Sequence, residues 1–260
     1  MGGLGTGELG AGELVHYGVD RGIARVVLDS PGNRNALSRQ LCAELHAHLT
    51  AAAKDPAVRA VELTHTGSVF CAGADISEAS SGPSISETMI TLLRRIVEMP
   101  KPVVARLDGH VRAGGLGLVG AADIALASRS VTFAFTEVLI GVAPAMITLT
   151  TLSRMTERAA GRYLLTGEKF DAATAAAVGL ITAAVDDLDR ATADLYDQFR
   201  TCSPQGLAET KLLTTRLTRE AINSRAEELA ALSARLFSTE EAKEGMRAFL
   251  EKRSPSWVLD

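Results

Sequence analysis

In the first half of the chain, short β-rich runs alternate with segments of helical periodicity. The run Ile23–Leu28 ends at turn-forming residues 29–32, which predicts a strand followed by a turn. From Leu37 to Leu49 a leucine recurs every four residues, and Ser38 can cap the start, so an amphipathic helix is expected up to the Asp55–Pro56 stop. By the same criteria we expect strands at 60–64, 103–107, 124–127 and 131–134, helices at 86–98 and within 109–120, and a mobile Ser-rich loop at 77–86. This alternation is typical of an α/β core with partly parallel sheets.

Beyond Pro144 the pattern becomes helical. Periods of 3.6 residues predict helices near 146–160, 172–178, 187–201, 205–218, 221–237 and 239–252, whereas the only β-rich run is 179–182. So many helices have little sheet to cover. We therefore expect some of their apolar faces to be buried against another subunit.

Composition narrows the class of protein. The chain has 260 residues, of which 47% are hydrophobic and 22% charged, so we expect one large globular domain with a sizeable core. Its 27 basic and 31 acidic side chains give a formal net charge of −4, and no long Lys/Arg cluster occurs. This balance argues against partners such as nucleic acid or an anionic membrane.

The termini and cysteines suggest where the protein works. Residues 1–12 are Gly-rich, with neither a basic nor an apolar signal region, and are expected to form a flexible tail. No uncharged apolar run is long enough to cross a membrane, so a cytoplasmic enzyme is the default. Cys42, Cys71 and Cys202 show no paired spacing, which predicts reduced, mostly buried thiols rather than disulfides or a zinc site.

Two segments match the dinucleotide-binding pattern GxGxxG. Gly5, Gly7 and Gly10 follow no strand and carry little weight. Gly115, Gly117 and Gly120 follow the 103–107 strand, but residues 108–114 intervene where a Rossmann turn would be immediate. A nicotinamide-dependent dehydrogenase is therefore kept as the alternative from another enzyme class.

The same glycines could instead expose backbone N–H groups to one oxygen atom. Gly73 permits a turn that exposes the Ala74 N–H, and the Gly114 N–H lies at the predicted start of a helix. Two such donors would make an oxyanion hole, in which each donor is worth on the order of 3 kcal/mol to a developing oxyanion.

Several separated motifs, in order, resemble the crotonase (enoyl-CoA hydratase/isomerase) superfamily. They are CAGAD at 71–75, DGHVRAGGLGL at 108–118, FAFTEVLIGVAP at 133–144, LTGEKFDAATAAAVGLIT at 165–182 and EGMRAFLEKR at 244–253. The resemblance implies a crotonase-like spiral α/β core of ββα turns over 13–200 and a C-terminal helical trimerisation region over 201–260. It also implies a homotrimer or dimer of trimers, a coenzyme A thioester as substrate rather than a bound cofactor, and an oxyanion hole formed by Ala74 and Gly114.

The resemblance also points to the acid–base chemistry. Hydratases of this family use two glutamates; the second corresponds to Glu137, whose apolar flanks predict partial burial, while the first position is occupied by Gly117. Adding water requires both activation of water and protonation of C2, which two carboxylates can divide between them. A lone carboxylate better suits a Δ3,Δ2-enoyl-CoA isomerase, although hydration by one glutamate plus water, or a non-catalytic coenzyme A-binding module, stays open.

The remaining candidates concern binding. Arg34 and Lys252 could contact the coenzyme A phosphates, and the resemblance places Phe249 near the adenine of a neighbouring subunit's coenzyme A. It also places the neighbours of Ala74, which are Ala72, Asp75 and Ile76, in the coenzyme A site.

Three further expectations complete the set. Arg112 could reach an acyl carboxylate in the acyl pocket or point to solvent, and His110 could line the same pocket or be structural. We expect neither a metal site nor a serine triad. An apolar stripe on the last helix, Ala242, Met246, Phe249 and Leu250, is expected at the subunit interface.

Overall fold

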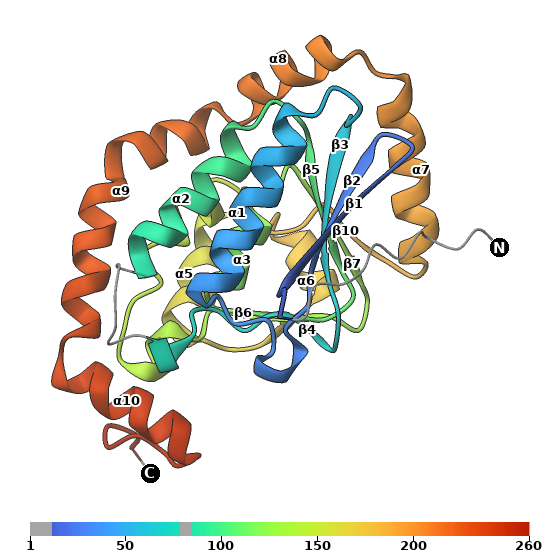
Figure 1. The fold of residues 1–260 in the computed structure, drawn as a ribbon. Helices are drawn as coiled ribbons and strands as arrows, with labels where there is room; N and C mark the ends of the chain where they lie inside the picture. The colour runs from blue at the N-terminus through green and yellow to red at the C-terminus, as the bar shows by residue number, and fades with distance from the viewer. Residues whose placement is uncertain (1–11, 79–84, 260) are drawn as a thin grey trace.

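The computed structural model describes residues 12–78 and 85–259, which contain two sheets (Figure 1). The larger has six strands in the order β1 (Val15–Asp20), β2 (Ile23–Leu28), β3 (Ala60–His65), β5 (Val103–Leu107), β7 (Ile124–Ser128) and β10 (Ala183–Val185). Its pairings are parallel except for the β1–β2 hairpin. The smaller sheet has the order β4 (Val69–Cys71), β6 (His110–Arg112), β8 (Thr132–Ala134) and β9 (Phe170–Asp171), and only β9 is antiparallel to its neighbour.

The chain winds through both sheets in repeating turns. Each turn adds one strand to the large sheet and one to the small sheet before a helix follows: β3, β4 and α2 (Ile85–Glu98), then β5, β6 and α3 (Gly114–Ala121). The third turn runs β7, β8 and the 3-10 helix η3 (Thr136–Ile140). This is the crotonase-like ββα spiral that the motifs implied.

Helix α1 (Arg39–Lys54) follows the opening hairpin and begins at the predicted cap, where the Ser38 hydroxyl accepts from the Leu41 N–H. Its leucines at 41, 45 and 49 are fully buried in the main core together with Val61 and Leu63 of β3. Because side chains alternate along a strand, Glu62 and Thr64 face the other side of the sheet.

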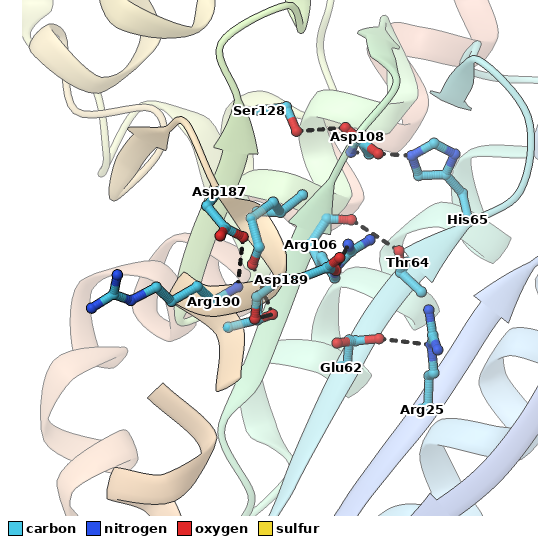
Figure 2. Close-up of polar contacts among 12 residues, drawn as sticks. Arg25, Glu62, Thr64, His65, Arg106, Asp108, Ser128, Asp187, Asp189 and Arg190 are labelled. Atoms are coloured by element: carbon cyan, nitrogen blue, oxygen red, sulfur yellow. Dashed lines mark hydrogen bonds and ion pairs between the residues drawn. The ribbon is translucent and has the colours of Figure 1, made fainter. Parts of the chain in front are cut away.

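That other side is covered by α7 (Leu188–Thr201), whose Tyr196 and Phe199 pack on Ile23 and Val104. Polar contacts bind the layers together: the Tyr196 hydroxyl donates to Glu62 at 2.6 Å, and Glu62 also pairs with Arg25 at 2.8 Å. Figure 2 shows Glu62 pointing towards Arg25, with Thr64 and Arg106 on the same face of the sheet and Asp189 of α7 close by. This polar layer lies on the opposite face of the sheet from α1.

The C-terminal helices α8 (Pro204–Thr214), α9 (Arg216–Phe237) and α10 (Glu240–Glu251) wrap the core along one side (Figure 1). Ile222 and Leu229 of α9 belong to the main core, which α9 reaches by packing on α2 and α4 (Thr148–Thr151). Buried Lys211 of α8 pairs with Asp123 at 2.8 Å. The helical region at 201–260 therefore shares one core with the spiral. No helix in the described ranges has the length and apolarity needed to cross a bilayer.

Several expected elements differ from the structure. The prediction of one helix over 146–160 is wrong, because a turn separates α4 from α5 (Glu157–Thr166). The hydroxyls of Thr150 and Thr151 donate to the Ile147 carbonyl and compete with the helical backbone. The Thr156 N–H donates to the Val178 carbonyl, outside the helix. Helix α6 (Ala172–Ala177) ends before the segment 179–182, where a strand was expected. The strand, β10, begins only at Ala183.

Other differences involve short strands. The sequence pattern does not predict β1, β4, β6 or β9. Because β6 occupies His110–Arg112, the helix expected within 109–120 begins only at Gly114. Cys202 is exposed, contrary to expectation, whereas Cys42 and Cys71 are buried free thiols. Most of the expected tail and part of the Ser-rich loop lie outside the described residues.

Candidate active site

Three consecutive turns of the spiral bring the predicted catalytic segments to one edge of the small sheet. Strands β4, β6 and β8 are adjacent and parallel, with Cys71 paired to Val111 and Val111 to Phe133. Carboxyl ends of parallel strands meet at the same edge. The turn containing Ala74, the start of α3 and the segment leading to Glu137 therefore converge there.

Ala74 is held by a short parallel bridge to Leu37. The Leu37 N–H donates to the Gly73 carbonyl at 2.8 Å, and the Asp75 N–H donates to the Leu37 carbonyl at 3.3 Å. Ala74 lies between Gly73 and Asp75, the two residues that bond to Leu37. In a parallel bridge the residue in this middle position directs its own N–H away from the partner strand. Within the described ranges, no atom accepts a hydrogen bond from the Ala74 N–H. It is thus free to donate to a ligand, as the sequence predicted.

Gly114 supplies the second predicted donor, as the first residue of α3. Its N–H likewise has no acceptor in the part of the chain that the structure describes. The two donor segments are in contact, because a Cβ built on Gly73 would lie 3.1 Å from the Gly114 nitrogen. Gly73 also has φ +95°, so glycine is required there both by conformation and by space.

Ala113, between β6 and α3, has a positive φ of 45° with ψ −123°, a backbone conformation that side-chain-bearing residues rarely adopt. Such backbone strain costs on the order of 1–3 kcal/mol and persists only where its surroundings enforce it. Here the Ala113 N–H donates to the Ala134 carbonyl at 3.1 Å, which ties the turn to β8. The turn that presents the Gly114 N–H is therefore held in a strained conformation by the neighbouring strand.

Glu137 lies in η3, directly after β8. Burial raises the pKa of its carboxyl group to about 7, and its buried Oε2 atom has no hydrogen-bond partner among the described residues. A carboxyl group with such a pKa can accept and return a proton near neutral pH. The partial burial that its apolar flanks predicted is confirmed.

Gly117, where hydratases of the family carry their first glutamate, faces apolar side chains. A Cβ built there would lie 2.8 Å from Ile147 Cγ2 and 3.5 Å from Leu93 Cδ2. Ile147 is 2% exposed, so this side of α3 is a packed interface. No carboxylate occupies the position.

The other glycines of this GxGxxG segment also serve packing. A Cβ on Gly115 would lie 2.9 Å from the Cys71 carbonyl oxygen, and one on Gly120 would lie 2.9 Å from the Thr150 carbonyl oxygen. Every residue of α3 is buried against protein. Dinucleotide binding would require the backbone of these glycines to be exposed to a phosphate, and here it is covered by neighbouring segments.

Arg112 and His110 are engaged within the small sheet. The Arg112 guanidinium donates to the Thr132 carbonyl at 2.6 Å and to the Thr132 hydroxyl at 2.8 Å, while the Thr132 N–H donates to His110 Nδ1 at 3.2 Å. Burial lowers the pKa of Arg112, and burial with the nearby Arg112 and Lys169 charges lowers the pKa of His110. These contacts join β6 to β8. They favour the structural alternative for His110 and show that the Arg112 guanidinium bonds to Thr132 within the sheet.

Four predicted coenzyme A contacts lie together. The Arg34 carbonyl accepts from the Ala72 N–H at 3.1 Å, which joins these two segments, and the Arg34 side chain is exposed. Asp75 Oδ1 accepts from the Ser77 N–H at 3.0 Å and caps the 3-10 turn η2 (Ile76–Glu78). Arg34, Ala72, Asp75 and Ile76 thus surround the bridge that holds Ala74.

Phe249 and Lys252 lie apart from this group along the sequence, near the end of α10, and both are exposed. The stripe expected at a subunit interface is wrong in one respect: Ala242 is fully buried within its own chain. Phe249 and Leu250 remain 50% and 66% exposed.

A serine, an aspartate and a histidine also gather at the edge of the large sheet (Figure 2). The Ser128 hydroxyl donates to Asp108 Oδ1 at 2.5 Å, and His65 Nε2 accepts from the Asp108 backbone N–H at 3.3 Å. The imidazole therefore faces a backbone amide and not the serine. This arrangement cannot activate Ser128 as a triad would.

Sequence reasoning missed three residues that shape the site: Asn35, Leu37 and Ala113. The leucine repeat places Leu37 only on the apolar face of a helix, and no sequence pattern singles out Ala113. An available signal was Asn35, since asparagine tolerates the left-handed conformation that it adopts here with φ 52°.

Comparison with known proteins accords with this geometry. The family model described as enoyl-CoA hydratase/isomerase matches residues 18–259. A Danio rerio protein, enoyl-CoA hydratase domain-containing protein 3, mitochondrial, is 31% identical over 91% of this chain and 84% of its own length. The 1,2-epoxyphenylacetyl-CoA isomerase of Escherichia coli is 30% identical over 95% of this chain and 98% of its own.

Among solved structures, an enoyl-CoA hydratase from Mycobacterium avium superposes with a TM-score of 0.89 at 54% identity and covers 94% of this chain and 99% of its own. Fold, motif order and family model thus agree. The chain belongs to the enoyl-CoA hydratase/isomerase family, the crotonase superfamily that its motifs resemble.

Proposed function

We propose that this protein acts on an acyl-coenzyme A thioester and moves a proton along the acyl chain, as an enoyl-CoA isomerase does, in preference to adding water. The observation that carries the proposal is the carboxyl group of Glu137, whose buried Oε2 atom has no partner among the described residues and whose pKa is raised. The position of the first family glutamate is occupied by Gly117, which packs on Ile147. That arrangement supplies a proton shuttle but no second group to activate water.

Polarisation of the substrate is assigned to the two free amides. The Ala74 and Gly114 N–H groups donate to the thioester carbonyl oxygen, and their hydrogen bonds strengthen as negative charge develops on it. Because the donor turns are in contact through Gly73 and Gly114, both amides can serve one oxygen atom.

The proton step balances without any added reagent. Ionised Glu137 removes a proton from C2 of a 3-enoyl thioester, and the electrons of the C2–H bond delocalise onto the carbonyl oxygen as a dienolate. Glu137 then returns the proton to C4, the double bond moves to C2–C3 and the carbonyl re-forms. One carboxyl group performs both transfers, which suits a pKa near 7.

Substrate binding and assembly follow from the family in this proposal. Arg34, Ala72, Asp75 and Ile76 form the coenzyme A face of the Ala74 turn, and the protein is a homotrimer or a dimer of trimers. The support for assembly is the exposed apolar surface at Leu213, Leu217, Phe249 and Leu250, with exposures of 77%, 60%, 50% and 66%.

The decisive experiment offers 3-enoyl-CoA and 2-enoyl-CoA separately to the enzyme in heavy water, with products followed by absorbance and mass. We expect the 3-enoyl thioester to become the conjugated 2-enoyl isomer and to take up deuterium, while 2-enoyl-CoA gains water far more slowly. Hydration as fast as isomerisation would overturn the preference.

Two further outcomes separate the other classes of function. Coenzyme A binding without turnover or deuterium uptake would indicate a non-catalytic binding module. Calorimetric binding of NAD in place of coenzyme A would indicate a dehydrogenase.

A further inference from the structure

Asn35 is a fully buried polar residue beside the candidate active site, at 0% exposure. Its side-chain carbonyl accepts from the Ser30 N–H at 2.7 Å. Its amide nitrogen donates to the carbonyls of Thr66 at 3.1 Å and Val69 at 2.8 Å. Both amide hydrogens and the amide oxygen are thus used, and one side chain joins the ends of β2 and β3 to the start of β4.

The backbone that Asn35 fixes is unusual. Arg34 and Asn35 are consecutive non-glycine residues in the left-handed region, with φ 60° and 52°. This conformation is uncommon outside glycine and persists where the surroundings hold it. The three hydrogen bonds of the Asn35 amide supply that restraint.

The segment 34–37 is also the partner of the Ala74 turn. The Arg34 carbonyl accepts from the Ala72 N–H, the Leu37 N–H donates to the Gly73 carbonyl, and the Leu37 carbonyl accepts from the Asp75 N–H. These three bonds leave the Ala74 N–H as the unpaired donor of the turn. The direction of that N–H therefore depends on where the segment 34–37 lies.

We propose that Asn35 is a positioning residue for the oxyanion hole: its buried amide fixes the segment 34–37, which in turn aims the Ala74 N–H at the thioester carbonyl. The inference rests on the proposed function, because it presumes that Ala74 donates to the substrate. Asn35 itself touches neither substrate nor reacting atoms.

Two variants at Asn35 test the hydrogen bonds of the side-chain amide while keeping the backbone conformation accessible. Asn35→Gly keeps the left-handed conformation accessible and removes only the side-chain amide. Asn35→Asp keeps the shape but, with at most one O–H, cannot donate to both the Thr66 and Val69 carbonyls. A matched control is Tyr196→Phe, which loses a buried hydrogen bond to Glu62 on the opposite face of the large sheet. All three lose stability, but only the Asn35 variants should disturb the hole.

The readouts are turnover at saturating 3-enoyl-CoA and the infrared carbonyl frequency of bound, carbon-13-labelled butyryl-CoA, which does not react. In the wild-type protein the bound carbonyl should absorb at lower frequency than in solution, because two N–H groups polarise it. We expect both Asn35 variants to lose at least half of this shift and to turn over ten- to a hundredfold more slowly. Tyr196→Phe should retain both.

The outcomes are distinct. A folded Asn35 variant with the wild-type frequency shift and turnover overturns the inference, and so does an equal loss of turnover in Tyr196→Phe at matched thermal stability. If one Asn35 variant does not fold, the other still tests whether Asn35 positions the Ala74 N–H. Absence of any shift in the wild-type protein refutes the proposed oxyanion hole itself, and the role of Asn35 with it.

Discussion

Gly245 of α10 lies directly on the backbone of Ile140, so that a Cβ at Gly245 would come within 2.5 Å of the Ile140 carbonyl oxygen. A second close approach joins Gly141, with φ +76°, to the Glu241 backbone, where a Cβ would lie 2.9 Å from the carbonyl oxygen. Helix α10 is therefore seated on η3, the short helix that carries Glu137. The C-terminal helix supports the candidate acid–base residue of its own chain, whatever it does in an oligomer.

Gly245→Ala should consequently destabilise the fold and impair turnover. The added methyl meets backbone, which cannot rotate away, so overpacking should cost about 1–3 kcal/mol of the free energy of unfolding. Displacement of η3 should also lower kcat. Thermal denaturation and steady-state kinetics measure the two effects.

The matched control is Gly161→Ala at an exposed position of α5, where no atom of the described residues outside the helix turn itself lies within 4 Å of the new Cβ. There alanine should be neutral or raise stability by up to about 1 kcal/mol through helix propensity. Equal behaviour of the two variants would refute the close seating of α10.

Glu137→Gln should preserve folding and thioester binding but lower turnover by about a hundredfold or more, because an amide cannot accept the proton. Butyryl-CoA affinity by calorimetry checks binding, and circular dichroism checks the fold. Glu157→Gln, an exposed glutamate at the start of α5, is the control and should keep full activity. Near wild-type turnover in Glu137→Gln would remove Glu137 from the mechanism.

The raised pKa of Glu137 also predicts a pH dependence of stability. The folded-state pKa of about 7 lies above the ordinary value of 4.5, so between these values the folded protein holds a proton that the unfolded chain has released. The free energy of unfolding should therefore fall as pH rises from 4.5 to 7, by up to about 3 kcal/mol from this group, and then level off.

Urea denaturation of wild type and Glu137→Gln across this range isolates the contribution of Glu137. The variant should gain stability relative to wild type as pH rises. A constant difference between pH 4.5 and 8 would contradict the elevated pKa.

Supplying a glutamate at the first of the two family positions tests the proposed preference for isomerisation over hydration. Gly117→Glu alone would press on Ile147, so the sharper variant is the double substitution Gly117→Glu with Ile147→Ala, which makes room for the carboxylate. We expect it to raise hydration of 2-enoyl-CoA relative to isomerisation, with Ile147→Ala alone as the control. A folded double variant without a gain in hydration would show that the missing glutamate does not limit hydration.

Lys252→Ala tests the expected phosphate contact at the end of α10. Loss of a charge-assisted hydrogen bond should weaken substrate binding by roughly 1–3 kcal/mol, seen as a higher KM, and leave kcat largely intact. Lys252→Arg should restore binding, and Lys243→Ala, whose ammonium pairs with Glu240 on the same helix, should change little. An unchanged KM in Lys252→Ala would exclude the contact.

Local sequence was sufficient for the longer elements and for the main positions of the site. Helix α1 follows from leucines at regular spacing behind a serine cap, because periodicity and capping depend on residues within one turn of each other. Ala74, Gly114 and Glu137 stand in contiguous motifs, so the family resemblance assigns them to the candidate site without knowledge of packing.

What depended on tertiary structure involves residues far apart in the chain. Strands as short as β4 and β6 carry too few residues for a pattern and form only because neighbouring strands pair with them. The sequence left open whether Arg112 reaches an acyl group or solvent, and only the fold brings Thr132 of the neighbouring strand to its guanidinium. Burial raises the pKa of Glu137, and Ile147 packs against Gly117. Neither follows from local sequence, because desolvation and close packing are set by segments that only folding brings together.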